Sequence, residues 1–152
     1  MFKVISISAL LIVAICASKE TFEVCDFGRA EILGKIVTVR ARIQFSRHGM
    51  AILANSCREK VGAASLMLPG FKDSPEVRFT LEKDGLDKLR PFFHPNGGVA
   101  TGCATMTGQI FYKSDFENHA VGGGMVGNGF GANGLMRAAF VVKSVEGIQP
   151  CE

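Results

Sequence analysis

The sequence predicts an all-β domain, a small five-stranded barrel with one short helix. Three observations carry this prediction. Residues 35–46 alternate apolar and polar side chains throughout, which is typical of a half-buried strand. Four further apolar or threonine-rich runs follow, separated by glycine and proline. Four cysteines beyond residue 17 indicate that two disulfides hold the domain closed.

Residues 1–17 have the layout of a secretory signal peptide. A basic residue, Lys3, precedes an apolar run, and small residues follow before a charged pair. That run is shorter than the roughly 20 residues that a membrane-spanning helix needs. We expect cleavage after Ala17, which leaves 18–152 as a single exported domain, periplasmic or secreted. Cys16 raises one alternative, a bacterial lipoprotein signal, and membrane attachment would then depend on a lipid at Cys16.

The charge pattern gives no reason to expect nucleic acid or an anionic membrane as a partner. Removing Lys3 with the signal peptide lowers the formal net charge from +3 to +2. Acidic and basic residues are mixed along the rest of the chain. Such a pattern offers no basic surface for nucleic acid or for an anionic membrane, so we expect neither partner on electrostatic grounds.

The first three strands are expected in quick succession. The strand at 35–46 turns at 47–49 into a hairpin partner at 50–54, and a third strand at 63–68 stops at a Pro-Gly pair. Residues 71–98 follow as an irregular connection with one short helix, capped by Asp84. On the first strand the inward face is expected to carry Val37, Val39, Ala41, Ile43 and Phe45.

Two more strands complete the barrel. They are expected at 99–112 and 137–145. Between them, the glycine-rich segment 119–134 is expected as a mobile connection or as a flexible lip that contacts a ligand or partner. Gly102 and Gly108 inside the first of them predict a bend or bulge. Five strands with a helix between the third and the fourth have the count and order of the OB-fold, so the predicted fold is an OB-like barrel. A β-sandwich is the alternative, but it usually has seven or more strands.

The strand order also selects a disulfide pairing. Cys103 and Cys151 fall at the same end of the two last strands, and Cys25 and Cys57 fall at one end of the first hairpin. We therefore expect Cys25–Cys57 and Cys103–Cys151. The sequence contains no short Cys or His pair of the kind that structural zinc sites use, so we expect no metal and no other cofactor.

No motif marks a catalytic site. The segment 129–134 matches GxGxxG, but a strand follows it where a dinucleotide site needs a helix. There is no GxSxG turn, and paired cysteines cannot act as nucleophiles. We therefore expect no catalytic residue and a protein that is not an enzyme. A hydrolase would need at least two of five residues in one pocket, namely His48, His94, Asp115, Glu117 and His119.

Three residues are candidates for ligand contact. Arg40 and Arg42 lie two apart on the outer face of the first strand, and Phe130 lies in the glycine-rich segment with Met125 as a second apolar tip. An OB-fold can bind oligonucleotides or sugars on a strand face that carries aromatic residues, but this chain has no Trp and one Tyr. The alternative for the two arginines is a solvated face.

Two stretches carry a resemblance to known proteins. The first combines Cys25, the run from Gly34 to Arg40, a hairpin and Cys57, and the second combines Phe130-Gly131 with Phe140-Val141-Val142. Together they resemble small exported bacterial OB-fold-like proteins of unassigned function. The resemblance implies the barrel fold and export, and it implies no catalytic residues. At Ala132 the chain departs from that pattern, where a polar residue, often His, is expected.

Three functions remain open. The first is an exported binding module of the cell envelope that contacts a protein or glycan partner through a barrel face and the segment 119–134. The second is a hydrolase of envelope material with a site that no motif marks. The third is a structural part of an envelope assembly, which would show an exposed apolar patch or open strand edge and no concave pocket.

Overall fold

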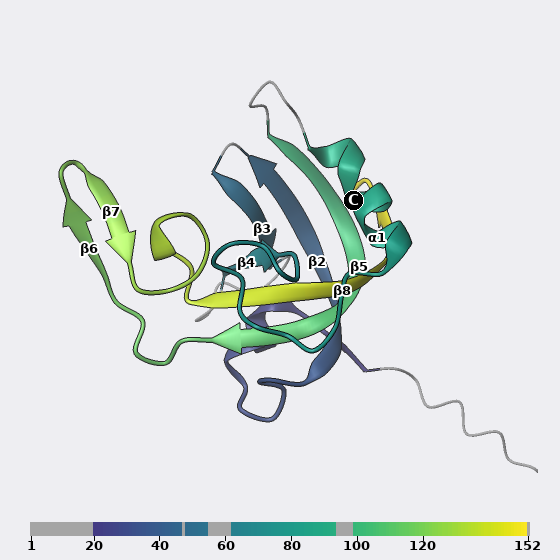
Figure 1. Cartoon of the computed structure of the whole chain (residues 1–152), viewed down its shortest axis with the longest axis horizontal. Coiled ribbons are helices and arrows are strands. Elements are labelled where there is room, and N and C mark those ends of the chain that lie inside the picture. The colour runs from purple at the N-terminus through teal and green to yellow at the C-terminus, as the bar shows by residue number, and fades with distance from the viewer. Residues whose placement is uncertain (1–19, 47, 55–61, 94–98, 152) are drawn as a thin grey trace, which may run out of the picture.

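Five strands close into a barrel in the computed structural model, which describes residues 20–46, 48–54, 62–93 and 99–151 (Figure 1). The barrel strands are β2 (Ile36–Ser46), β3 (Gly49–Leu53), β4 (Ala63–Met67), β5 (Ala100–Tyr112) and β8 (Ala138–Gln149). Neighbouring strands pair in the order β2-β3-β4-β8-β5, and β5 pairs with β2 to close the ring. The pair β4–β8 is parallel and the other pairs are antiparallel. The predicted OB-like barrel is confirmed.

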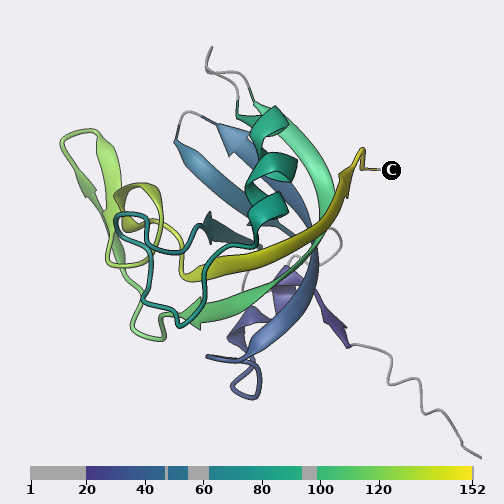
Figure 2. The same cartoon turned by 45° about the vertical axis from the view of Figure 1, so that its right-hand side comes forward.

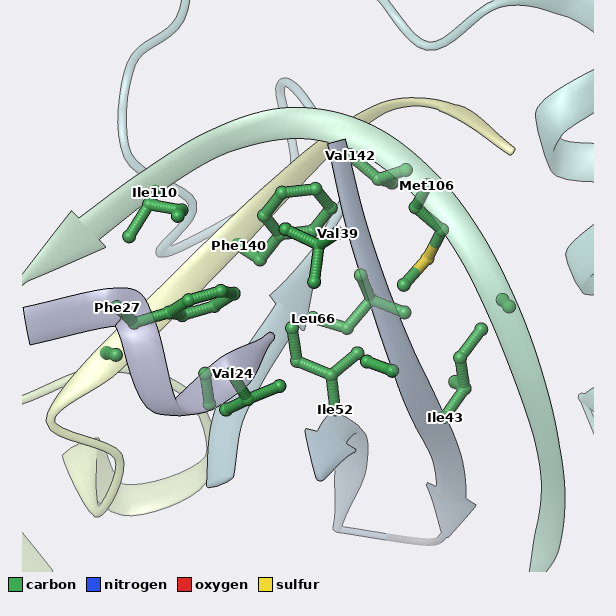
Figure 3. Close-up of a cluster of buried hydrophobic side chains, with 14 of the residues drawn as sticks. Val24, Phe27, Val39, Ile43, Ile52, Leu66, Met106, Ile110, Phe140 and Val142 are labelled. Atoms are coloured by element: carbon green, nitrogen blue, oxygen red, sulfur yellow. The ribbon is translucent and has the colours of Figure 1, made fainter. Parts of the chain in front are cut away.

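The alternation of β2 explains how the barrel obtains its core. Val39 and Ile43 point inward and are fully buried, whereas Arg40 and Arg42 between them are exposed. Each strand contributes its inward residues to a single apolar cluster, shown in Figure 3. Because one face of every strand is removed from water in this way, the register of the sheet is fixed by the hydrophobic pattern.

Short helical elements add to that core. The 3-10 helix η1 (Val24–Gly28) places Phe27 beside Phe140, with the two ring centroids 6.0 Å apart (Figure 3). Helix α1 (Lys83–Leu89) packs along β8 and buries Leu89 completely. A further 3-10 turn, η2 (Arg90–Phe92), stacks Phe92 on Phe45 at 5.7 Å. The predicted short helix between the third and fourth barrel strands is therefore present, but the predicted cap at Asp84 is wrong. The N-cap is Glu82, and Asp84 lies inside the first turn, where it pairs with Lys88.

The predicted bulge lies where β5 crosses β8. The register of this pair shifts between Thr107 and Gly108 and again between Thr105 and Met106. β8 extends to Gln149, four residues further than predicted, because it continues to pair with β5 beyond the second shift. A two-residue strand that the sequence did not predict, β1 (Thr21–Phe22), lies parallel to β2.

The glycine-rich segment contains regular structure that was not predicted from the sequence. It forms a hairpin of β6 (Asn118–Val121) and β7 (Gly124–Gly127), which stands away from the barrel in both views (Figures 1 and 2). The hairpin turns at Gly122 and Gly123, both with positive φ, as a two-residue turn of this kind requires. A short 3-10 turn, η3 (Ala132–Gly134), then leads into β8. Gly122 and Gly123 permit the tight turn that brings β6 and β7 together, so here glycine favours a hairpin.

One of the two predicted disulfides is present. Cys103 joins Cys151, with the two Cα atoms 5.0 Å apart. Cys103 pairs with Gln149 in the β5–β8 ladder, so Cys151 lies just beyond its partner, as the argument from strand ends requires. Cys25 is also disulfide-bonded, but Cys57 lies outside the described residues, and the pairing Cys25–Cys57 stays a prediction. No helix among the described residues is long and apolar enough to cross a membrane.

Candidate binding groove

A groove of about 260 Å³ opens on the outer face of the barrel. Its floor is formed by the outward-facing residues of three neighbouring strands, and its wall is the segment that connects the hairpin to β8. The described residues that line it are Gln44, Ser46, His48, Gly49, Met50, Ala51, Leu53, Ser65, Gly131, Ala132, Leu135 and Met136.

The floor follows from the pairing of the strands. Gln44 of β2 lies opposite Ala51 of β3, and Ala51 lies opposite Ser65 of β4. These three residues form a row across the sheet, because residues directly opposite in a ladder point to the same face. Ala51 and Ser65 are small, so the row is a depression between longer side chains. The small outward residues of β3 and β4 thus leave open the space that forms the groove, which larger side chains at these positions would fill.

The wall stands close to the floor because of one glycine. Gly131 has a φ of 73°, and a Cβ atom at this position would lie 2.9 Å from the Oγ of Ser65. A side chain here would therefore have to push the wall away from β4. The backbone of the wall is held by paired hydrogen bonds between Phe130 and Met136, at 2.7 and 2.9 Å.

The chemistry of the groove is mainly apolar. Its larger apolar lining residues are Met50, Leu53, Leu135 and Met136, while Gln44, Ser46, Ser65 and His48 supply hydrogen-bonding groups. None of its described lining residues is aromatic apart from His48, and none is acidic. Such a lining can desolvate aliphatic side chains and fix them with a small number of polar contacts. Its described lining residues include no carboxylate.

The predicted contact residues lie at different places. Arg40 and Arg42 are exposed on the outer face of β2 and do not line the groove, although Arg42 lies opposite Leu53 of β3, a groove residue. Arg40 instead lines a separate hollow of about 200 Å³, together with Glu146 and Gly147 at the bulge of β8. Phe130 is half-buried and does not line the groove, but its backbone holds the wall in place. The structure therefore places Arg42 and Phe130 beside the groove, and Arg40 away from it.

The residues that a hydrolase would need are not gathered in the groove. His48 lines it, whereas Asp115, Glu117 and His119 lie along the exposed base and first strand of the hairpin. His94 is outside the described residues. Within the described part of the chain, no group of three His, Cys, Asp or Glu residues is arranged to hold a metal ion.

Sequence reasoning missed the residues that form the floor. Ala51 and Ser65 are small residues on outward strand positions, and nothing in their spacing distinguishes them from an ordinary solvated face. One sequence signal for the groove was available. Small residues occupy outward positions on β3 and β4, and the segment that packs over them contains a glycine. That signal becomes readable only when the barrel order places β4 beside the start of β8.

Comparison with known proteins gives no relative. No protein-family model, no curated protein and no solved structure matches the chain. The resemblance to small exported OB-fold-like proteins therefore stays an expectation from the residues that carry it, and function has to be argued from the groove itself.

Proposed function

We propose that this protein is an exported binding module whose groove receives an extended apolar segment of a protein partner. The observation that carries the proposal is the groove, an apolar depression across β2, β3 and β4 with one wall built by the segment 131–136. In OB-folds the corresponding surface, a strand face flanked by the loops after strands 1 and 4, is the common binding site.

The size and lining of the groove favour a peptide segment. Its volume of about 260 Å³ lies below the range of roughly 300–1,000 Å³ typical of small-molecule pockets, and it spans three strands. An extended chain presents every second side chain to one side, which suits a shallow apolar groove with a few polar groups at its rim. Gln44 and Ser46 could accept or donate hydrogen bonds to the backbone of such a segment.

A glycan is the less favoured ligand for this groove. Sugars carry many hydroxyl groups, and a buried hydroxyl without a hydrogen-bond partner costs free energy. The described lining offers four polar side chains and no Trp, Tyr or Phe on which a sugar or base ring could stack. Glycan binding is therefore an outcome that the experiment below has to distinguish.

Export rests on two features of the chain. Residues 1–17 have the pattern of a secretory signal, and the disulfide Cys103–Cys151 is the kind of bond that persists in oxidising compartments. A role in an envelope assembly is the second candidate function, and the exposed apolar side chains of the hairpin β6–β7 favour it.

The test is panning of a library of random short peptides on residues 18–152, which contain every strand of the barrel. We expect apolar peptides to be enriched and their binding to be lost in Ala132→Arg, which places a charged side chain on the exposed groove wall. Ala30→Arg makes the same exchange at an exposed position that does not line the groove and should leave binding intact. Peptides that bind both variants equally, or sugars that bind in place of peptides, would contradict the proposal.

A further inference from the structure

We propose that two copies of this chain associate through the outer edge of β6, so that the two hairpins form one four-stranded antiparallel sheet. The inference concerns residues 118–127, none of which lines the groove, and it does not rest on the proposed function. Its occupant is a second copy of the same chain.

The hairpin is a two-stranded sheet whose strands pair only with each other in the described part of the chain. It also contributes nothing to the barrel core, and its apolar side chains Val121, Met125 and Val126 are 54%, 44% and 38% exposed. A two-stranded hairpin is marginally stable in water, and a third strand is generally needed to stabilise it. The hairpin therefore has both open edges and apolar surface to offer to another strand.

The register shows which backbone groups point out of the hairpin. The two-residue turn at 122–123 makes Val121 and Gly124 a hydrogen-bonded pair, and such pairs alternate along the ladder. The bond from the Asn128 N–H to the Glu117 carbonyl, at 3.1 Å, fits this alternation. Asn118 and Ala120 consequently direct their N–H and C=O groups away from β7, toward the outer edge of β6.

The opposite edge is less accessible. Gly127 of β7 packs against the backbone of Gly134, where an added Cβ would lie 3.2 Å from the Gly134 carbonyl carbon and closer still to its oxygen. The turn η3, which leads into β8, contacts β7 and therefore crowds the Gly127 end of this strand. At the β6 edge no described residue outside the hairpin pairs with Asn118 or Ala120.

The shortness of β6, four residues, is a feature that limits edge pairing, but the hairpin lacks the other common ones. Exposed edges are normally protected by charged residues, proline or bulges. The segment 118–136 contains no Lys, Arg, Asp, Glu or Pro, in a chain that is 20% charged, and the four pairs of β6–β7 follow in unbroken register. A second copy of this chain supplies the same uncharged edge. Pairing of the two edges about a two-fold axis therefore opposes no like charges, although each copy carries a net charge of +2 once residues 1–17 are removed.

The arrangement leaves room for a second molecule. The hairpin projects from the barrel in both views, so a partner hairpin can align with β6 without the two barrels meeting (Figures 1 and 2). The paired strands are only four residues long, which limits the contact area. We therefore expect a weak dimer, with a Kd on the order of tens of micromolar.

Sedimentation of residues 18–152 over a rising concentration series tests the proposal. We expect the wild type to pass from monomer to dimer. Ala120→Pro removes an N–H that points out of the hairpin, so it should weaken the dimer at least tenfold while the hairpin still forms. Met125→Pro is the matched control, because it removes the outward N–H at the opposite edge and should leave the dimer intact.

A second variant decides the case if Ala120→Pro disturbs the hairpin itself. Ala120→Lys keeps the N–H but places two lysines beside the two-fold axis, so the dimer should weaken at low salt and recover partly at high salt. A wild type that remains monomeric at all concentrations overturns the proposal. So does a dimer that tolerates both Ala120 variants, or one that Met125→Pro weakens as strongly as Ala120→Pro.

Discussion

Gly108 of β5 packs directly against the ring of Phe140 of β8. A Cβ atom at Gly108 would lie 2.7 Å from the Phe140 Cζ, and closer still to the carbonyl oxygen of Val141. Real Cβ atoms do not approach other atoms this closely, so the barrel can close at this point only because residue 108 has no side chain. Phe140 is fully buried and belongs to the central cluster, which ties this contact to the stability of the whole core.

The first prediction follows from this contact. Gly108→Ala should lower the free energy of unfolding by about 2–3 kcal/mol, because the added methyl group meets backbone that cannot move aside. Gly147→Ala is the matched control in β8, since a Cβ there would meet open space. Urea unfolding of both variants measures the difference. Equal stability of the two would show that β5 and β8 can separate at Gly108 without loss.

The disulfide Cys103–Cys151 gives a second prediction. It joins residues 48 apart and fixes the end of β8 to β5. Replacing both cysteines by alanine should lower the free energy of unfolding by about 2–4 kcal/mol, largely because the unfolded chain regains conformational freedom. Urea unfolding without reductant, which leaves the other cysteines as they are, measures the loss. A double variant as stable as the wild type would mean that the C-terminal segment does not help to hold the barrel closed.

Helix α1 carries a pH-dependent contact. The Nζ of Lys88 lies 2.7 Å from the Oδ2 of Asp84, and this hydrogen bond together with the positive charge lowers the pKa of Asp84 below its usual value of 3.8. A carboxylate with a lowered pKa stabilises the folded state above the unfolded pKa, and that contribution disappears as the pH falls through the folded pKa.

The third prediction is a pH profile of stability. The wild type should be slightly more stable than Asp84→Asn at neutral pH, and the gap should close in acid below the folded pKa of Asp84. The effect is small and decreases with added salt, because both side chains are substantially exposed. In a Lys88→Met background the same exchange should show no pH-dependent gap. A gap that persists in acid would assign the effect to something other than this ion pair.

Asn128 is expected to hold the base of the hairpin. Its side-chain oxygen accepts a hydrogen bond from the Glu117 N–H, and its amide nitrogen donates to the Asp115 carbonyl, both at 2.9 Å. Asn128→Ala removes both bonds, so amide hydrogen exchange over 118–127 should speed up by several-fold while exchange in β2 stays slow. Asn128→Asp keeps the hydrogen-bond acceptor and loses the donor. Its amide exchange over 118–127 should therefore be faster than in the wild type and slower than in Asn128→Ala. Unchanged exchange in the alanine variant would argue that the hairpin does not depend on this side chain.

The sequence predicted the barrel well because its strands have strong local patterns. In β2 the alternation from Val37 to Phe45 determines both the strand and its buried face, and the Pro-Gly pair after residue 68 marks the end of β4. The hairpin β6–β7 was missed because glycine is a poor strand residue, although two adjacent glycines at 122–123 are a recognised hairpin signal.

The candidate site was mostly beyond the reach of local patterns. The groove depends on the approach of Gly131 to Ser65, two residues that are far apart in sequence and meet only after β4 and β8 have paired. Arg40 and Arg42 stand out in the sequence as charges on a strand face, yet neither lines the groove, and only Arg42 lies beside it, opposite Leu53. A functional surface formed by tertiary contact between small residues leaves little trace in the sequence.

The most direct test of the account is an NMR titration of labelled residues 18–152 with an apolar peptide selected by panning. Binding in the groove predicts that the backbone resonances of Ala51, Ser65 and Ala132 shift together as peptide is added, while those of Arg40 and Glu146 remain in place. Shifts concentrated at Arg40, Arg42 and Glu146, with the groove residues unchanged, would contradict the assignment of the binding surface.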